Sequence, residues 1–466
     1  MTEPPASKFR LEYLVGAAIV AVLLVTGLLI WRGGRGELAV VELQPLPGDP
    51  AAPAGQPLRV RFDQPLIADS QALTLTLIPP ASGQVHVEGD AVIFTPDRPL
   101  APDTQYTAQL AAGVTGQQGQ RLARPITWRF HTSRPHLVYE GVDNQGRAQL
   151  FTAPMGSPAA APAARQLTDA EFGVSGFDVA PDGNTAVYAA PNSDGSLDIW
   201  RVDLVTGGSD LLLECPQAMC TNPAWSPDGK LLAVSARVGD ATTPMLTAPA
   251  HLWLLDMETG ENTQVFPDEQ TYSFGARWSD DGQWLSYDML DQSQVGVYNV
   301  EDGRLNRFSS TTREGGAWRP GHRELVISRE AALAPFTEVH LFLVDPVAGD
   351  KLDLSLGEQP VADGHAAWSP DGEWLALRRS VLTPDLSNIG VHQIWRLAAD
   401  GSQAQPLTGA PEFDHGAPVW SPDGRYLAYH RVPMGGSIAS SELWVMDVAS
   451  GDAWKVAAGQ APQWGP

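Results

Sequence analysis

The chain has 466 residues, 43% of them hydrophobic, which is enough to bury a core and excludes a globally disordered protein. Its 54 acidic and 30 basic residues give a formal net charge of −24, which disfavours nucleic acid and anionic membrane surfaces as partners. The simplest interpretation of this charge is that it keeps an extracytoplasmic protein in solution.

An apolar segment is the first predicted element. Residues 14–31 carry no charged side chain, and their number is at the lower limit for a membrane-spanning helix. Two basic residues lie on each side, so the positive-inside rule does not orient the segment. Because residues 1–13 are too few for a domain, we expect a short cytoplasmic tail, one transmembrane signal-anchor and an extracytoplasmic remainder. No A-x-A-like site follows, which favours an uncleaved anchor over a removed signal peptide.

Short strands with period-two alternation follow over residues 37–134, separated by Gly, Pro and Asp. This pattern predicts a small antiparallel β-sandwich. Four motifs resemble bacterial Ig-like domains of surface-layer and other envelope proteins: Phe62-Asp63-Gln64-Pro65, Phe94-Thr95-Pro96, Leu100-Ala101-Pro102-Asp103-Thr104-Gln105-Tyr106 and Trp128-Arg129-Phe130-His131-Thr132. The resemblance implies a spacer or adhesion unit, and a structural stalk is the plainer alternative.

The motif Trp-Ser-Pro-Asp-Gly recurs along the last two thirds of the chain. Full copies begin at Trp225, Trp368 and Trp420, and weaker or truncated copies at Val179, Trp278, Trp318 and Trp464, so that the spacing is 40–53 residues. Ser-Pro-Asp-Gly favours a type I turn between two strands. A strand-rich repeat of about 40–50 residues is typical of a β-propeller, because one blade cannot bury both its faces alone.

The two ends of the repeat region predict how the propeller closes. Residues 136–169 match strands two, three and four of a blade, and residues 461–464 match a first strand that no blade follows. We therefore predict an all-β fold in which residues 136–466 form seven blades, the first of them completed by the C-terminal strand.

The repeats resemble the TolB-type, WD40-like (PD40) propellers of bacterial envelope proteins. The motifs that carry this resemblance are Pro223-Ala224-Trp225-Ser226-Pro227-Asp228-Gly229 and Leu252-Trp253-Leu254-Leu255-Asp256, with their equivalents over about 330 residues. The resemblance implies the fold but not a function, since one fold hosts many functions. TolB itself is six-bladed, so the predicted count departs from it.

The two cysteines, Cys215 and Cys220, favour a disulfide in an exported protein, with two free thiols as the alternative. The ten histidines show no metal-ligand spacing. Residues 143–146 and 192–198 faintly resemble calcium loops but lack the terminal glutamate, so turns are the better interpretation. We expect no metal and no cofactor.

The loops that link successive blades end just before the innermost strands, so they should surround the mouth of the propeller channel. Mixed polar and aromatic residues at these positions form a candidate ligand-binding site, or else solvated loop ends: Asn222, Phe274, Arg277, Glu314, His365 and His415. Longer loops between strands two and three, at residues 239–250, 330–337, 380–391 and 433–441, should lie on the same face, where they contact a partner or pack on themselves.

The sequence contains no G-x-S-x-G, H-E-x-x-H or P-loop motif. These observations predict a monomeric, membrane-anchored extracytoplasmic protein, single-pass in the cell membrane, that binds an envelope protein, peptide or glycan without catalysis, and not nucleic acid. The alternative is an envelope lyase or hydrolase with its site in the channel mouth, using His365, His415 and Glu314. A purely structural envelope component is the third hypothesis.

Overall fold

The computed structural model describes most of the chain beyond residue 37. The described residues are 38–465, without 50–51, 53–56, 68–72, 97–99, 134, 157–162, 241–242, 267–271, 290–291, 311–313, 334–335, 358 and 384–390. The predicted cytoplasmic tail and transmembrane segment, residues 1–13 and 14–31, lie outside the described residues. Within the described part of the chain, no helix is long and apolar enough to cross a membrane.

The chain divides into two compact units. Apart from short exchanged segments, the first ends at Thr132 and the second begins at Ser133. The first unit contains two sheets, with strand orders β1-β2-β5-β4 and β3-β6-β7. Its strands are β1 (Val40–Gln44), β2 (Leu58–Phe62), β3 (Leu75–Ile78), β4 (Gly83–Glu88), β5 (Ala91–Pro96), β6 (Gln105–Leu110) and β7 (Ile126–His131).

The alternation predicted for this first unit explains its core. In β2 every second side chain is buried, namely Leu58, Val60 and Phe62, while the arginines between them are half-buried. Tyr106 of β6 stacks on Phe130 of β7, with ring centroids 5.7 Å apart. The unit is therefore a small antiparallel β-sandwich, as the sequence predicts.

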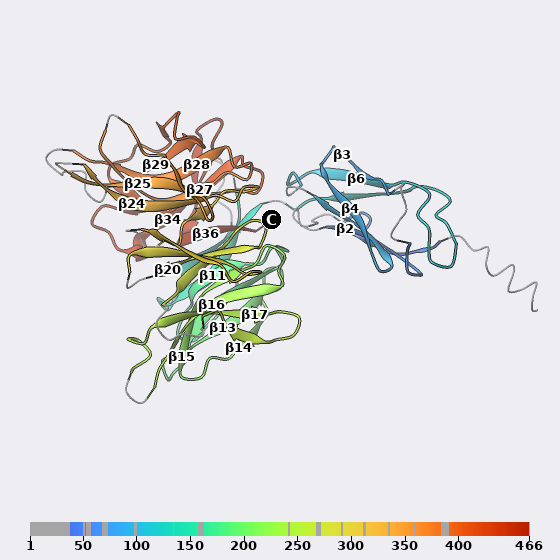
Figure 1. Ribbon diagram of the computed structural model, residues 1–466, viewed down its shortest axis with the longest axis horizontal. Coiled ribbons are helices and arrows are strands. Elements are labelled where there is room, and N and C mark those ends of the chain that lie inside the picture. Colours follow the sequence, from blue (N-terminus) through green and yellow to red (C-terminus); the bar gives the residue numbers. More distant parts are fainter. Residues whose placement is uncertain are drawn as a thin grey trace, which may run out of the picture. The chain divides into compact units, whose positions relative to one another are not determined.

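The described residues of the second unit form seven successive antiparallel blades, numbered here in chain order (Figure 1). Two single parallel bridges, β13 to β15 and β25 to β27, join neighbouring blades. The strands of blades one to three are β36 (Gln460–Gly465), β8 (His136–Val142), β9 (Ala148–Pro154) and β10 (Arg165–Gln166); β11 (Ser175–Val179), β12 (Thr185–Pro191), β13 (Leu197–Asp203) and β14 (Ser209–Leu213); β15 (Ala218–Trp225), β16 (Leu231–Val238), β17 (Ala250–Asp256) and β18 (Asn262–Gln264).

Blades four to seven follow the same order, with the strand nearest the centre first. Their strands are β19 (Phe274–Trp278), β20 (Trp284–Met289), β21 (Gln294–Asn299) and β22 (Leu305–Ser309); β23 (Ala317–Trp318), β24 (Leu325–Leu333), β25 (Phe336–Asp345) and β26 (Gly349–Asp353); β27 (Val361–Trp368), β28 (Trp374–Val381), β29 (Gln393–Ala398) and β30 (Gln405–Pro406); β31 (Phe413–His415) with β32 (Val419–Trp420), β33 (Tyr426–Pro433), β34 (Glu442–Asp447) and β35 (Ala453–Ala458), together with the short 3-10 helix η1 (Ile438–Ser440).

The C-terminal strand closes the propeller. Strand β36 pairs antiparallel with β8, Trp464 opposite Leu137, so the predicted closure of the first blade is confirmed. The innermost strands contact one another in a closed ring, from β36 through β11, β15, β19, β23, β27 and β32 back to β36. The Gln463 side chain extends this closure to blade two, since its Oε1 accepts the Val179 N–H and its Nε2 donates to the Phe177 carbonyl, both at 3.0 Å.

The repeated tryptophan joins five of the seven blades to the preceding one. Its indole N–H donates to the carbonyl one residue before the equivalent tryptophan of the preceding blade, at 3.0–3.2 Å: Trp278 to Ala224, Trp318 to Arg277, Trp368 to Ala317, Trp420 to Ala367 and Trp464 to Val419. The indole nitrogen of Trp225 is buried without a hydrogen-bond partner among the described residues. Within the turn, the Ser226 hydroxyl donates to Asp228 at 2.7 Å and accepts the Leu231 N–H at 2.9 Å. The motif therefore encodes both a turn and an inter-blade hydrogen bond.

Two further features stabilise the blades, one between neighbours and one within a single blade. Cys215 and Cys220 form a disulfide between the end of blade two and the start of blade three, the alternative that the sequence favoured. In blade five, the ring of buried His340 lies between Glu338 at 3.0 Å and Asp353 at 2.8 Å. Both carboxylates raise the pKa of His340 and outweigh the lowering effect of burial.

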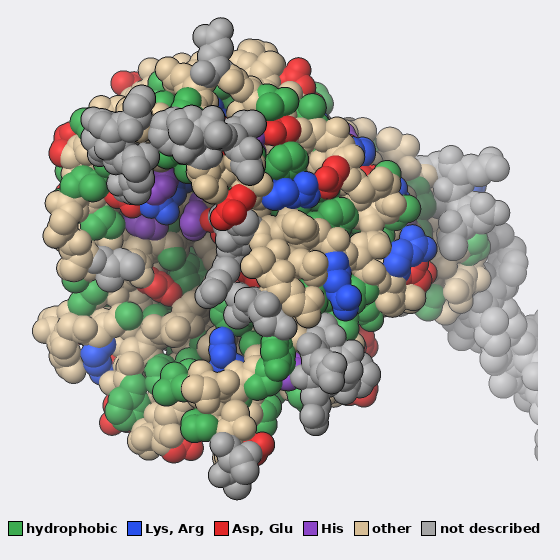
Figure 2. Space-filling model, turned by 60° about the vertical axis from the view of Figure 1, so that its left-hand side comes forward, with side chains coloured by type: hydrophobic (Ala, Val, Ile, Leu, Met, Phe, Trp, Pro, Cys, Tyr) green, Lys and Arg blue, Asp and Glu red, His purple; other side chains and the backbone are tan. Residues whose placement is uncertain are grey.

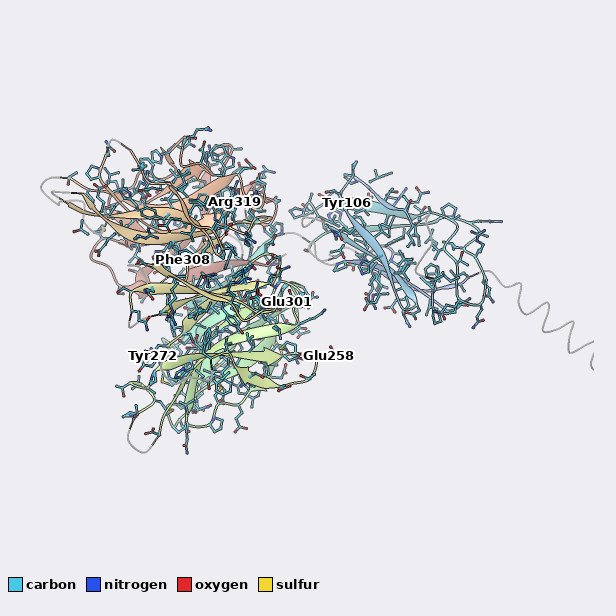
Figure 3. All side chains as sticks on the ribbon, in the orientation of Figure 1. Tyr106, Glu258, Tyr272, Glu301, Phe308 and Arg319 are labelled. Atoms are coloured by element: carbon cyan, nitrogen blue, oxygen red, sulfur yellow. A yellow bond between two sulfur atoms is a disulfide. The ribbon has the colours of Figure 1, made fainter. Side chains whose placement is uncertain are left out.

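The two ends of the blades present different loops. Figure 3 shows Glu258 and Glu301, which belong to turns between strands three and four, on one side of the propeller, and Tyr272, which belongs to a blade-linking loop, on the other. The blade-linking loops therefore share one face, and the candidate site lies on that face.

Candidate active site at the channel mouth

A local distortion recurs where each innermost strand reaches the channel mouth. The residue three positions before the repeated tryptophan, or its equivalent, has a positive φ in six of the blades, as observed among the described residues: Gly176, Asn222, Gly275, Gly315, His365 and Ala461. The strand register shifts at this point in most of these blades. Three of these residues are not glycines, namely Asn222 (φ 51°), His365 (φ 48°) and Ala461 (φ 48°), so the strained conformation belongs to the repeat and is not confined to one blade.

Glu314 and His365 form the central pair of the site. Glu314 precedes β23 of blade five, and His365 lies in β27 of blade six. One carboxylate oxygen lies 2.9 Å from His365 Nδ1, and the other accepts the His365 backbone N–H at 2.7 Å. The same carboxylate therefore fixes both the backbone and the ring of His365, whose side chain remains 41% exposed.

The electrostatics of this pair favour a charged carboxylate. Burial alone raises the pKa of Glu314, but the hydrogen bonds and charge of His365, with the more distant charge of Arg378, outweigh it and hold this pKa below its ordinary value. An ionised Glu314 accepts a hydrogen bond from Nδ1–H, so when His365 gives up a proton it is Nε2 that becomes the free basic nitrogen.

A cavity of about 290 Å³ opens beside the pair. Arg277, Glu314 and His365 line it together with small and apolar residues such as Ala417 and Val419. The cavity is thus lined by a histidine base, the carboxylate that orients it, and the positively charged side chain of Arg277. Figure 2 shows histidine side chains gathered beside acidic and basic ones around a hollow in the propeller surface.

A second polar group lies behind this pair, contributed by blades six and seven. Asp414 binds the guanidinium of Arg378 and, at 2.9 Å, Nδ1 of His392. Burial and the positive charges of Arg378 and His365 lower the pKa of His430 to about 4, so His430 is neutral at pH 7. His430 Nδ1 and Arg378 Nε are buried without a hydrogen-bond partner among the described residues.

The structure brings together part of the predicted site. Arg277, Glu314 and His365 share the cavity, whereas Asn222 of β15 and Phe274 of β19 do not line it. His415 is almost completely buried, its Nδ1 lies 3.1 Å from the His392 carbonyl, and burial lowers its pKa, so it supports the site from behind.

Sequence reasoning missed the residues contributed by other strands. Arg378 and His430 lie on second strands, and His392 immediately precedes a third strand. Their signal in the sequence was only a local excess of histidine in blades six and seven. Asp178 of β11 was also missed; it accepts the Trp225 N–H at 2.7 Å, and burial raises its pKa to about 6 against the opposing effects of that hydrogen bond and of Arg277.

Comparison with known proteins identifies the first unit. Residues 35–132 match the family described as bacterial Ig-like domain. This stretch is a bacterial Ig-like domain. The resemblance noted in the sequence is thereby confirmed, and the strands β1 to β7 are the strands of this domain.

Solved structures agree with the propeller fold. A structure of prolyl endopeptidases matches with a TM-score of 0.50 and 13% identity, over 78% of this chain and 49% of that chain. TolB from Acinetobacter baumannii matches with a TM-score of 0.44 and 14% identity, over 84% and 83% of the two chains. At these identities the likeness concerns the fold alone, a TolB-like propeller that follows the Ig-like domain in the sequence.

A curated relative bears on function. The chain is 26% identical over 212 residues to a protein of Bacillus subtilis (strain 168) named "Uncharacterized peptidase YuxL". The match covers 44% of this chain and only 29% of the relative. The prediction of a non-catalytic binding or scaffold protein was wrong, because this named relative is a peptidase. That prediction relied on the absence of known catalytic sequence motifs. Glu314 and His365 are 51 residues apart in the sequence, so a search for short motifs cannot detect such a pair.

Proposed function

We propose that this protein is a hydrolase of acyl bonds, with peptides as its substrate class and its active site at the channel mouth. The observation that carries the proposal is the Glu314–His365 pair beside an open cavity. The peptidase name of the curated relative supports the reaction class. Since the match spans less than a third of that relative, the reaction is argued from the residues of this chain.

The chemistry follows from the geometry of the pair. His365 Nε2 takes a proton from a water molecule while the water oxygen bonds to the carbonyl carbon of the substrate. Glu314 accepts a hydrogen bond from Nδ1–H at 2.9 Å, keeps the ring in the required tautomer and stabilises the imidazolium that forms. When the tetrahedral species collapses, the carbon–nitrogen bond breaks and the leaving amine receives the proton from His365 Nε2.

Arg277 supplies the positive charge that this reaction needs. It lines the same cavity as His365, where a guanidinium stabilises the negative oxygen of the tetrahedral species. Arg378 and His430 do not line this cavity. Arg378 acts at a distance, because its positive charge helps to keep the pKa of Glu314 low and that carboxylate ionised.

The cellular setting is part of the proposal. The apolar residues 14–31 anchor the chain in the cell membrane, and the Ig-like domain and seven-bladed propeller lie outside the cytoplasm. A disulfide between Cys215 and Cys220 suits that oxidising location. The substrates are then peptides of the envelope, and we propose that the protein acts as a monomer.

The test is hydrolysis of fluorogenic peptide amides and of an activated ester by the full chain. We expect His365→Ala to lower kcat by about 100-fold or more, the usual loss on removing a general base. The matched control is His322→Ala, which removes an exposed histidine from a turn between strands one and two, where the sequence motif recurs. Equal activity of both variants and the wild type, or absence of hydrolysis in the wild type, would contradict the proposal.

A further inference from the structure

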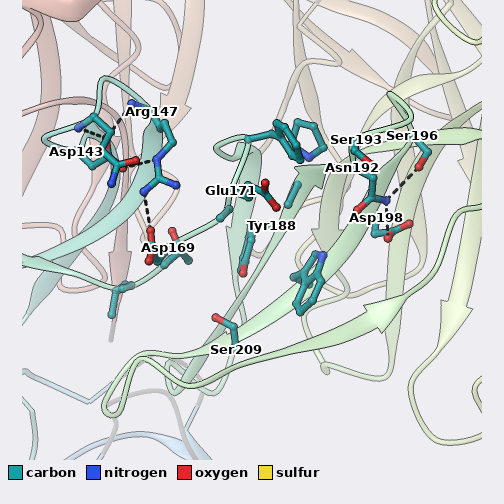
Figure 4. Close-up of a pocket in the computed structure, with 18 of the residues that line it drawn as sticks. Asp143, Arg147, Asp169, Glu171, Tyr188, Asn192, Ser193, Ser196, Asp198 and Ser209 are labelled. Carbon is teal, nitrogen blue, oxygen red and sulfur yellow. Dashed lines mark hydrogen bonds and ion pairs between the residues drawn. The ribbon is translucent and has the colours of Figure 1, made fainter.

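A second and larger cavity lies between blades one and two (Figure 4). Its volume is about 1220 Å³, and its walls are the β8–β9 hairpin, the linking residues 166–172, the β12–β13 hairpin and residues at and beyond both ends of β14. We call it the blade 1–2 groove. It shares no lining residue with the channel-mouth cavity, and the proposed hydrolysis does not use it.

The groove is strongly acidic. Among the described residues that line it, six carboxylates accompany a single arginine, Arg147: Asp143, Asp169, Glu171, Asp194, Asp198 and Glu214. A concave surface lined by one sign of charge concentrates ligands of the opposite sign. The overall charge of −24 adds to this field.

Part of this charge is already neutralised within the groove. Arg147 bridges Asp143 at 2.8 Å and Asp169 at 2.6 Å. Asp198 accepts hydrogen bonds from Asn192 at 2.8 Å and from the Cys215 N–H at 2.7 Å. These contacts satisfy the carboxylates of Asp143, Asp169 and Asp198.

Two carboxylates are not used in this way. Glu171 and Glu214 are exposed, and neither has a hydrogen-bond or ionic partner among the residues that the structure describes. In the view of Figure 4, Glu171 lies between the group around Arg147 and the group around Asn192. The groove therefore offers two free negative charges to a ligand.

Aromatic rings complete the lining. Tyr188 is buried, Trp200 is half-buried and Phe172 is half-exposed at its edge. The alkyl stems of lysine and arginine pack well on such rings while their charged ends reach carboxylates. A sugar would require broad exposed ring faces for stacking, and here only Phe172 presents one.

We propose that the blade 1–2 groove binds a basic peptide segment. Lysine or arginine side chains pair with Glu171 and Glu214, and their stems lie against Phe172 and Trp200. This site goes beyond the proposed hydrolase activity and does not depend on it, because binding can be measured without turnover.

Fluorescence anisotropy of a labelled oligolysine peptide with the full chain at low salt tests the proposal. We expect Glu171→Gln combined with Glu214→Gln to weaken binding about tenfold, the combined effect of losing two exposed charge pairs. The matched control is Glu258→Gln with Glu261→Gln, which removes the same charge from an exposed turn on the other face. The control should bind like the wild type.

Thermal unfolding of both double variants confirms that they remain folded. Equal weakening by both would show that only the net charge attracts the peptide, and would overturn the proposal. Failure of the wild type to bind oligolysine would also overturn it, as would preferential binding of a neutral oligosaccharide.

Discussion

Replacement of Glu314 by glutamine probes the orienting carboxylate without changing its size. Glu314 accepts two hydrogen bonds from His365, at 2.7 Å from the backbone N–H and at 2.9 Å to Nδ1. A glutamine amide has one oxygen, so one of these donors must face an NH₂ group. Losing one hydrogen bond to a charged acceptor costs about 1.5–3 kcal/mol. At about 1.4 kcal/mol for each factor of ten, kcat should fall roughly 10- to 150-fold.

The assay is steady-state hydrolysis of a fluorogenic peptide amide, with kcat and KM measured separately. We expect the loss in kcat, because Glu314 acts through His365 and stabilises charge that develops in the transition state. Glu301→Gln is the control, since Glu301 is an exposed carboxylate on the opposite face of the propeller. A Glu314→Gln variant that is folded and retains kcat within threefold of the control would refute the orienting role.

Three further predictions concern stability. Replacing His340 by leucine removes the ring that lies between buried Glu338 and half-buried Asp353, and should lower the free energy of unfolding by about 3 kcal/mol in urea titrations. Because the pKa of His340 is raised, its stabilisation is complete below about pH 6.5 and is lost as pH rises through the raised value. Replacing Cys215 and Cys220 by alanine should lower the free energy of unfolding by about 2 kcal/mol, because the unfolded chain is no longer constrained by a short closed loop. If chemical reduction of the disulfide left the stability of the wild type unchanged, this prediction would be wrong. Burial raises the pKa of Asp178 to about 6, so ionising this carboxyl group is harder in the folded protein than in the unfolded chain. As the pH rises from about 4 to 6, the wild type should therefore lose stability relative to Asp178→Asn. Parallel pH profiles of the two proteins would contradict this.

The repeats explain why the fold could be predicted. Serine, proline, aspartate and glycine specify a turn locally, and the tryptophan before them donates a hydrogen bond to the preceding blade. Because each blade reuses the same interactions, the incomplete copies at the two ends revealed how the ring closes. Trp464, in the last strand, confirms this by binding Val419 of blade seven and pairing opposite Leu137 of blade one.

The site was only partly predictable for the same physical reason. Residues three or four positions before the repeated tryptophan lie where the innermost strand meets the blade-linking loop, which placed Glu314 and His365 near the channel mouth. The positions of Arg378, His392 and His430 depend on how blades six and seven pack, which no local pattern encodes. The blade 1–2 groove likewise arises between two blades, so the acidic hairpins that line it looked like ordinary turns.

Hydrolysis in heavy-oxygen water tests the central claim most directly. The full chain is incubated with a peptide substrate in water labelled with heavy oxygen, and the masses of the products are measured by mass spectrometry. The account predicts one labelled oxygen in the new carboxyl group with the wild type and little product with His365→Ala. Cleavage without incorporation of the label, as a lyase would produce, or equal labelled product from both proteins would contradict it.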